Sequence, residues 1–269
     1  MAKKRVSKRK PRKRNKIKIR TIVIWTITAL ILLSGAYAVQ MYLSYRHNGI
    51  GAKVPQGDYA YGIDISRYQP DVEWDELKLL IDDQGITTTS QEAAEESEEI
   101  SYVFIKATEG TSLKDKHFKK HWKKAKEAGV RRGAYHFFRS SKDAEKQANH
   151  FIKTVGKLTK DDLPPVLDIE TIHDGCPHKV LNDRALTWLK AVEKHYGRKP
   201  IVYSNASFIN DILCEEIKKN YPIWVAHYET HRPRCKRWHI WQFTDRGILP
   251  GIEGNVDMNV TSKEFLESI

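Results

Sequence analysis

Asp168 and Glu170 close the run PPVLDIE, whose apolar and β-branched residues are typical of a buried strand. On a strand, residues i and i+2 project to the same face, about 7 Å apart along the chain. Two carboxylates held this close raise each other's pKa, so that one can keep its proton while the other is charged. The pair could therefore supply a proton donor and a negative charge at one bond. A helix N-cap or a salt bridge would use the same residue types without any chemistry.

Further candidate residues occur in runs of the same kind. Asp64 lies in YGIDIS and Asp257 lies in NVDMNV. Four carboxylates that meet at one place fit either glycoside hydrolysis or a divalent metal site. Aromatic rings favour the first reading, because their flat faces and polar edges suit sugar rings. Rings lie on these runs or at their ends at Tyr135, Tyr203, Trp224, Tyr228 and Trp241. We therefore expect a glycan site that uses no metal and no cofactor.

Eight short apolar runs must position these residues. They lie at 61–66, 102–107, 133–138, 165–170, 200–205, 221–228, 237–243 and 255–260. Amphipathic segments typical of helices lie near 71–81, 115–128, 141–155, 179–196 and 207–218. Gly129, Gly156 and Gly197 stand where three of these helices would end.

Alternation of buried strands with helices favours a parallel sheet covered by helices. We predict an α/β fold, a β/α barrel of about eight strands and five helices, with the acidic residues at the carboxyl ends of its strands. An open doubly wound sheet is the alternative. No G-x-G-x-x-G motif follows the first run, so a dinucleotide site is not supported.

The N-terminal part of the chain has a different composition. Residues 1–20 contain 12 Lys or Arg and no acid, while the rest of the chain balances 34 basic residues against 34 acidic ones. Because the excess charge is confined to this tail, the rest has no positive field that would attract nucleic acid. No charged residue occurs from Thr21 to Leu43, a length that can cross a bilayer of about 30 Å.

We predict a basic cytoplasmic tail at 1–20, a transmembrane anchor in the lipid bilayer at 21–45, a linker at 46–58 and a catalytic domain at 59–269. This topology places the catalytic domain in the periplasm or outside the cell. A cleaved signal peptide is the alternative, because Ala36-Tyr37-Ala38 resembles a cleavage site. Within the domain, 84–101 is acidic and poor in apolar residues, so we expect a solvated loop inserted before the second strand.

Three cysteines, Cys176, Cys214 and Cys235, lie in the part expected to be exported. An oxidising compartment permits one disulfide and leaves one thiol over. The spacing of the three residues matches no zinc site, and it leaves open which two would pair.

Eight motifs in chain order resemble those of glycoside hydrolase family 25, the muramidases also called Chalaropsis-type lysozymes. They are YGIDISRYQ, VFIKATEG, GAYHFF, PVLDIE, PIVYSN, IWVAHY, HIWQF and GNVDMN. The resemblance covers residues 61–260 and implies a barrel of eight strands and five helices. The activity it implies is cleavage of the β-1,4 bond between N-acetylmuramic acid and N-acetylglucosamine in peptidoglycan.

The resemblance also implies roles for single residues. Glu170 corresponds to the general acid/base and Asp168 to its partner carboxylate, while Asp64 and Asp257 complete the acidic cluster. The implied reaction retains configuration, and we expect the substrate's own acetamido group to assist it, oriented by Asp168. The groove would be lined by Tyr135, Tyr203, Trp224 and Gln242.

The expected partners are peptidoglycan glycan strands, and we expect the catalytic domain to be monomeric. A membrane-anchored barrel that binds glycans without cleaving them is the alternative function, and a metal-dependent hydrolase is a further one. The basic residues Arg67, Lys106 and Arg139 could contact carboxylates of muramic acid or of stem peptides, or could form surface ion pairs.

Overall fold

The computed structural model describes residues 22–37 and 51–269 of the chain, which divides into two units, Met1–Arg46 and His47–Ile269. In the first unit, 22–37 forms a helix with exposed apolar side chains. Within these two described ranges, no helix is long and apolar enough to cross a membrane. The predicted anchor over 21–45 is therefore not supported by its described part. The predicted tail 1–20 and residues 38–50 lie outside the described residues.

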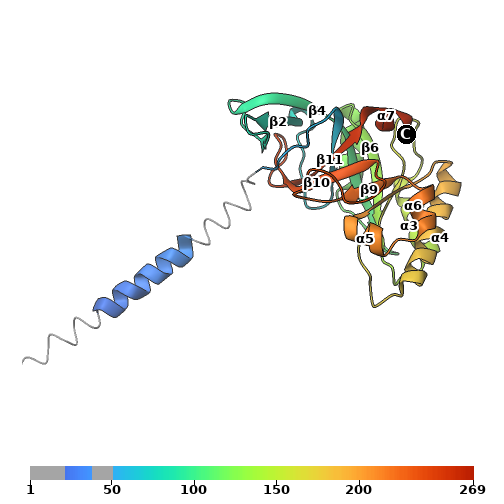
Figure 1. Ribbon diagram of the computed structural model, residues 1–269, viewed down its shortest axis with the longest axis horizontal. Helices are drawn as coiled ribbons and strands as arrows, with labels where there is room; N and C mark the ends of the chain where they lie inside the picture. The colour runs from blue at the N-terminus through green and yellow to red at the C-terminus, as the bar shows by residue number, and fades with distance from the viewer. Residues whose placement is uncertain (1–21, 38–50) are drawn as a thin grey trace, which may run out of the picture. The chain divides into compact units, whose positions relative to one another are not determined.

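In the second unit, eight strands close into a barrel in the order β1, β4, β6, β7, β8, β9, β10, β11 and back to β1 (Figure 1). Their bounds are Tyr59–Ile65, Ala94–Glu109, Arg131–Phe137, Val166–Asp168, Ile201–Asn205, Ile223–Ala226, Ile240–Gly247 and Val256–Ser262. Neighbours from β1 through β10 pair in parallel, whereas β11 is antiparallel to both of its neighbours. Each strand overlaps one predicted run, so the predicted eight-stranded barrel is confirmed.

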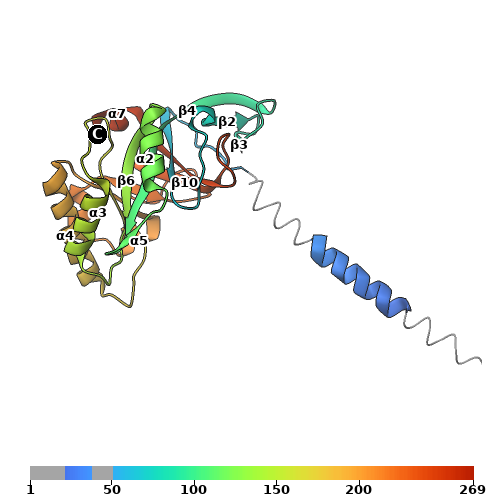
Figure 2. The same cartoon turned by 180° about the vertical axis from the view of Figure 1, so that it is seen from behind.

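Helices follow most of the strands and cover the outside of the barrel. They are α2 (Phe118–Glu127), α3 (Ala144–Val155), α4 (His178–Tyr196), α5 (Ala206–Asp211), α6 (Glu215–Asn220) and α7 (Lys263–Ser268). The side chain of Asp143 accepts a hydrogen bond from the Lys146 backbone N–H at 2.8 Å and so begins α3. Gly156 and Gly197 end α3 and α4, as predicted, and the two helices pack side by side (Figures 1 and 2). The single helix predicted at 207–218 is instead the pair α5 and α6.

Two expectations between the first and second barrel strands are wrong. The helix predicted near 71–81 is a 3-10 turn, η1 (Trp74–Glu76), followed by the strand β2 (Lys78–Asp82). The loop predicted at 84–101 contains β3 (Thr87–Thr88) and the first half of β4, which pair antiparallel with β2. Both segments form strands because the first part of β4 extends beyond the barrel and pairs with β2 (Figure 1). The glutamates of this extension are exposed, as expected of a solvated segment.

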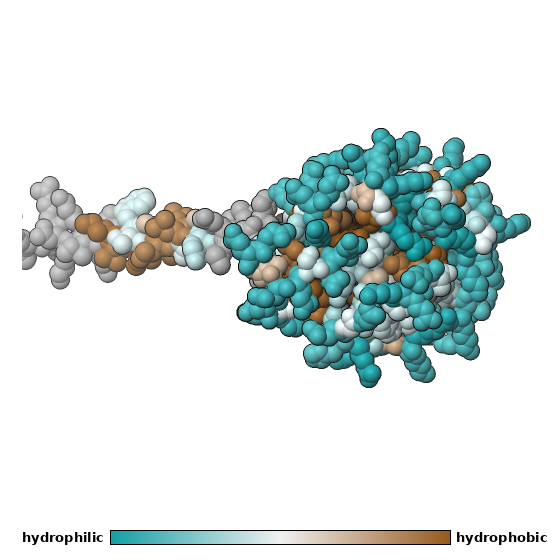
Figure 3. Space-filling view, turned by 90° about the horizontal axis from the view of Figure 1, so that it is seen from above, coloured by the Kyte–Doolittle hydropathy of each residue, from teal (hydrophilic) through white to brown (hydrophobic). Residues whose placement is uncertain are grey.

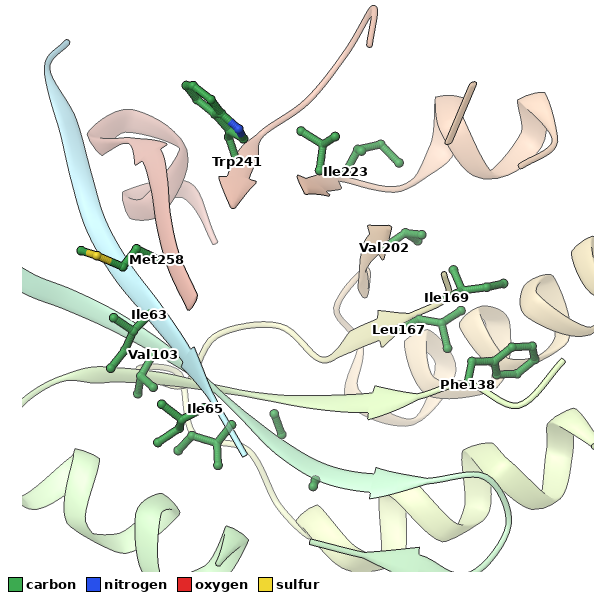
Figure 4. Packing of buried hydrophobic residues seen from close by; sticks show 14 of the residues in the cluster. Ile63, Ile65, Val103, Phe138, Leu167, Ile169, Val202, Ile223, Trp241 and Met258 are labelled. Carbon is green, nitrogen blue, oxygen red and sulfur yellow. The ribbon is translucent and has the colours of Figure 1, made fainter. Parts of the chain in front are cut away.

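Alternate side chains of the barrel strands enter two separate cores. One face joins the outer cluster between strands and helices, which includes Ile63, Val103, Leu167, Val202 and Trp241 (Figure 4). The opposite face fills the barrel interior with Ala60, Tyr102, Phe104, Val166, Ile201, Trp224 and Ile240. Large rings fit there because two strands carry glycine. A Cβ on Gly62 would lie 2.3 Å from the Tyr102 ring, and one on Gly133 would lie 2.4 Å from the Phe104 ring.

Candidate active site

The interior face changes from apolar to polar toward the carboxyl ends of the parallel strands. On four strands, the residue two positions after an interior apolar residue lies on the same interior face and is polar. These residues are Lys106 on β4, Asp168 on β7, Tyr203 on β8 and Gln242 on β10. Asp64 occupies the corresponding end of β1. Because β11 is antiparallel, its first residues reach the same rim, and Asp257 pairs directly opposite Asp64.

These side chains surround a cavity of about 190 Å³. It is lined by Asp64, Ser66, Tyr68, Lys106, Tyr135, Phe137, Asp168, Glu170, Tyr203, Trp224 and Asp257. The structure thus brings together all four carboxylates named from the sequence and three of the four predicted groove residues. The fourth, Gln242, is 1% exposed and does not line the cavity. On the face of the molecule seen in Figure 3, hydrophilic side chains frame recessed apolar surface.

Asp64 and Asp257 form a hydrogen-bonded pair of carboxyl groups. Asp64 Oδ2 also accepts hydrogen bonds from Gln242 Nε2 at 2.7 Å and from Asn259 Nδ2 at 2.9 Å. Burial and the neighbouring Asp64 charge raise the pKa of Asp257 well above its usual range. Since two carboxyl groups can hydrogen-bond only through a shared proton, and the amide donors favour charge on Asp64, we assign the proton to Asp257.

Asp168 and Glu170 form the second carboxyl pair. Asp168 is 7% exposed, and its Oδ1 atom has no hydrogen-bond partner within residues 22–37 and 51–269. Burial and the charge of Glu170 raise the pKa of Asp168 well above its usual range. Burial and the charge of Asp64 raise the pKa of Glu170, while the ammonium of Lys106 opposes both shifts. The site can therefore keep a carboxyl group protonated at a pH at which an exposed carboxyl group is charged.

A network of amides and rings fixes the orientation of Asp64. Gln242 Oε1 accepts hydrogen bonds from the hydroxyl groups of Tyr203 at 2.8 Å and Tyr228 at 2.6 Å. The amide nitrogen of Gln242 must therefore face Asp64. Asn259 is held in the same way, because its Oδ1 accepts from Trp224 Nε1 at 2.8 Å. The sequence prediction missed Asn259, although it stands two residues after Asp257 on one strand and so shares its face.

Four of the five aromatic residues named from the sequence divide between the two cores, whereas Tyr228 is 36% exposed. Trp224 is 2% exposed, and its ring lies 4.7 Å from the rings of both Phe104 and Tyr203, so it closes the bottom of the cavity. Trp241 belongs to the outer cluster and donates from Nε1 to the His227 carbonyl at 2.8 Å. Trp241 is therefore a core residue that does not line the cavity, and its side chain lies on the face of β10 opposite to Gln242.

The three cysteines and the four carboxylates of the possible metal site all lie among the described residues. Cys176, Cys214 and Cys235 are free thiols, so the disulfide that their number permits is not formed. Across 22–37 and 51–269, no group of three or more His, Cys, Asp or Glu side chains is arranged to hold a metal ion.

Comparisons with known proteins identify the family to which the chain belongs. The sequence matches Glycosyl hydrolases family 25 over residues 63–252. It is 40% identical over 210 residues to uncharacterized protein YegX of Escherichia coli (strain K12), covering 77% of this chain and 71% of that protein. It is 31% identical over 212 residues to Lysozyme M1 of Streptomyces globisporus, covering 74% and 66%. A family 25 glycosyl hydrolase structure from Bacillus anthracis aligns with a TM-score of 0.66 at 30% identity, covering 82% of this chain and 98% of that one. The chain therefore belongs to glycosyl hydrolases family 25 and is a glycoside hydrolase.

Proposed function

We propose that the protein is a peptidoglycan hydrolase that cleaves the β-1,4 bond between N-acetylmuramic acid and N-acetylglucosamine. The observation that carries this proposal is the meeting of Asp168 and Glu170 with Asp64 and Asp257 around one cavity. Its substrate is supported by the likeness to Lysozyme M1. Peptidoglycan glycan strands are thus the proposed partner, acted on by a monomeric catalytic domain.

In this mechanism Glu170 acts first as an acid. Its raised pKa lets it keep a proton, which it donates to the glycosidic oxygen as the bond from that oxygen to the anomeric carbon breaks. The carbonyl oxygen of the substrate's acetamido group forms a bond to the same carbon and gives a cyclic cation. Glu170, now a carboxylate, then removes a proton from water, which opens the ring with overall retention of configuration.

Asp168 supports the cyclic intermediate. Its Oδ1 atom is buried and unpartnered among the described residues, so it can accept the hydrogen of the acetamido N–H. As the ring closes, positive charge develops on the acetamido group and strengthens this hydrogen bond. Asp64 adds negative charge at the same rim, with Asp257 holding their shared proton. Tyr135, Tyr203 and Trp224 contact the sugar, and Gln242 orients Asp64 from below.

A barrel that binds glycans without cleaving them is not favoured. Such a protein has no use for a proton donor at the glycosidic bond, yet Glu170 is only part-buried and lines the cavity beside Asp168. A metal-dependent hydrolase would lose activity in a chelator, whereas the mechanism above predicts full turnover there.

The proposal includes an anchor at residues 21–45, with the tail 1–20 in the cytoplasm and the catalytic domain in the periplasm or outside the cell. It is supported by the sequence alone, through the uncharged stretch that follows twelve basic residues. Fractionation of cells that express the full chain tests it. Recovery of the protein in the washed membrane fraction, with protease able to reach residues 59–269 only from outside, is the expected result.

Product analysis tests the activity directly. Purified peptidoglycan is digested with the full chain, the products are reduced with borohydride, and mass spectrometry identifies the reduced sugar. The proposed bond leaves reduced N-acetylmuramic acid. Reduced N-acetylglucosamine, or the absence of soluble products, would overturn the proposal.

A further inference from the structure

One side of the cavity mouth carries three basic side chains that the proposed mechanism does not use. Lys106 lines the cavity, and its Nζ atom donates to Glu109 Oε2 at 2.9 Å. Arg139 Nε donates to the other carboxylate oxygen, Glu109 Oε1, at 3.0 Å. One carboxylate therefore holds two cations in place and can neutralise only one of them. The ion pair is also sheltered, because the side chains of Lys106 and Glu109 are only 13% and 14% exposed.

Two aromatic rings of the cavity wall complete this rim. The Phe137 ring centroid lies 4.7 Å from Lys106 Nζ and 5.2 Å from Arg139 Cζ, so both cations contact one ring. The third cation, Arg67, lies 5.1 Å from the centroid of the Tyr68 ring and donates to its hydroxyl at 3.2 Å. Arg67, Tyr68, Lys106, Phe137, Glu109 and Arg139 together are called the cationic rim below.

The charge of the cationic rim is not consumed by its own neighbours. Besides Glu109 and the acidic cluster of the cavity, Asp115 lies nearby, and its carboxylate accepts hydrogen bonds from the backbone N–H groups of Arg67 and His117, both at 2.9 Å. Outside the acidic cluster, three cations thus face two carboxylates, one of which accepts hydrogen bonds from backbone donors. Lys106 opposes the rise in the pKa values of Asp168 and Glu170, whereas Arg67 and Arg139 are not among the main causes of those shifts. The two arginines therefore require another explanation.

The chemistry of the proposed substrate supplies one. The ring hydroxyl and acetamido groups of a peptidoglycan strand are neutral, and carboxylates are carried only by the muramic residue. They belong to its lactyl ether where no peptide is attached, and to the stem peptide elsewhere. Arginine binds carboxylates through two parallel N–H donors, and side chains that are already oriented lose less freedom on binding. A glucosamine residue at the same position would leave the rim without an anion.

We propose that the cationic rim binds a carboxylate of the muramic residue, and that Arg67 and Arg139 thereby set the preference for muramic acid over glucosamine at the cleaved bond. This inference rests on the proposed function. It assigns the arginines a role in substrate binding and none in proton transfer.

Kinetics of the full chain with Arg67→Gln, Arg139→Gln and both changes together test the inference. Three soluble substrates are used: peptide-free strands with lactyl carboxylates, strands with stem peptides, and peptide-free strands whose lactyl carboxyl is converted to a neutral methylamide. For the double variant we expect KM to rise about tenfold or more on the substrate whose carboxylate the cationic rim binds. This is the effect expected for the loss of charge-assisted hydrogen bonds. We expect kcat and the pH profile to stay unchanged.

The substrate arms identify the source of the carboxylate. A rise in KM on peptide-free strands assigns the lactyl group, whereas a rise confined to peptide-bearing strands assigns the stem peptide. On the neutral methylamide strands the wild type and the double variant should have equal KM. Lys153→Gln, an exposed residue of α3, removes the same charge elsewhere and should behave as the wild type.

Two results would overturn the inference: an unchanged KM on both anionic substrates, or a displaced pH profile without a change in KM. Binding by the Glu170→Gln chain, measured calorimetrically with the peptide-free strands, separates this inference from the proposed function. If the wild type shows no turnover while binding still weakens on loss of the arginines, the proposed function fails and the cationic rim stands.

Discussion

Asp168 and Glu170 differ in their surroundings, although they lie two residues apart. Asp168 is nearly inaccessible and has an unpartnered oxygen atom, whereas Glu170 is only part-buried. The more accessible carboxyl group is the one that can exchange protons with both the glycosidic oxygen and water. The buried one is suited to hold a substrate dipole. Local burial thus supports the roles proposed for the two residues, which the sequence could assign only by resemblance.

Glu170→Gln should abolish release of soluble muropeptides, because an amide of the same shape cannot donate a proton. Loss of a general acid costs typically 10²–10⁴-fold in rate. Release of products from purified peptidoglycan is the measurement, and an unchanged circular dichroism spectrum is the control for folding. Turnover at the wild-type rate would refute the assigned role.

Asp168→Asn should lower kcat on the order of 10²–10³-fold, the typical cost of removing one group that stabilises charge in the transition state. The amide can still accept a hydrogen bond but carries no charge when the acetamido cation forms. Single-turnover kinetics of the full chain measure the effect. A loss of less than tenfold would contradict assistance by the acetamido group.

Asn259→Leu tests the link between the amide network and the acid. Without the Asn259 donor, Asp64 binds protons more readily, and its negative charge, which raises the pKa of Glu170, is reduced. The pKa of Glu170 should fall, so the alkaline limb of the activity profile should move to lower pH. Asn182→Leu is the matched control, since Asn182 is a buried amide with backbone partners on α4 and beyond α5. It should lower stability and leave the limb in place; an equal shift in both variants would contradict the link.

At the scale of elements, the barrel strands could be predicted because each short run is apolar enough to indicate a buried strand without reference to its neighbours. The eight runs carry the interior and exterior cores on alternate residues, and Gly62 is needed only because a neighbouring strand contributes Tyr102. The segment 71–81 could not be predicted in this way. Leu79, Leu80 and Ile81 are buried on both faces of β2, a pattern that a helix and a covered strand share.

The acidic first part of β4, residues 94–99, also could not be predicted from its own sequence. No alternation of apolar residues marks 94–99 as a strand, since Ala94 is its one apolar residue, and its structure comes from pairing with β2. Within the site, the positions of the four acids could be predicted because strand ends meet at one rim. The hydrogen bonds that orient Asp64 depend on β10 and β11 lying together, with Gln242 opposite Asn259, and that register cannot be read from either strand alone.

Gly62→Ala should destabilise the barrel, because the new Cβ would lie 2.3 Å from the ring of Tyr102, a fully buried side chain. Overpacking of this kind costs about 1–3 kcal/mol in the free energy of unfolding. Urea denaturation followed by tryptophan fluorescence measures it. The same change in a Tyr102→Leu background should cost much less, and equal costs in the two backgrounds would show that the ring is not the obstacle.

At the scale of the whole molecule, the active site works against the stability of the fold. The acidic cluster places four carboxyl groups in one buried region, and burial raises the pKa of each of them. Away from this cluster, Arg132 and Asp162 form a buried ion pair, with their Nε and Oδ1 atoms 2.6 Å apart. Paired charges lower the pKa of Asp162 despite its burial, so the two kinds of site respond to pH in opposite directions.

Asp257→Asn should therefore stabilise the protein, and increasingly so as pH rises. The pKa of Asp257 is higher in the folded state than in the unfolded chain, so its contribution to stability is complete below about pH 4 and is lost as pH rises toward the folded pKa. Asparagine can still donate a hydrogen bond to Asp64 and does not titrate. The difference in the free energy of unfolding between variant and wild type should grow by at most about 1.4 kcal/mol for each pH unit in that window. Urea denaturation at several pH values from 4 to 8 measures this difference, in which titrating groups remote from Asp257 cancel. Asp162→Asn is the control of opposite sign, because its lowered pKa gives stability above pH 4 that disappears in acid; a pH-independent difference for Asp257→Asn would contradict the assignment of the shared proton.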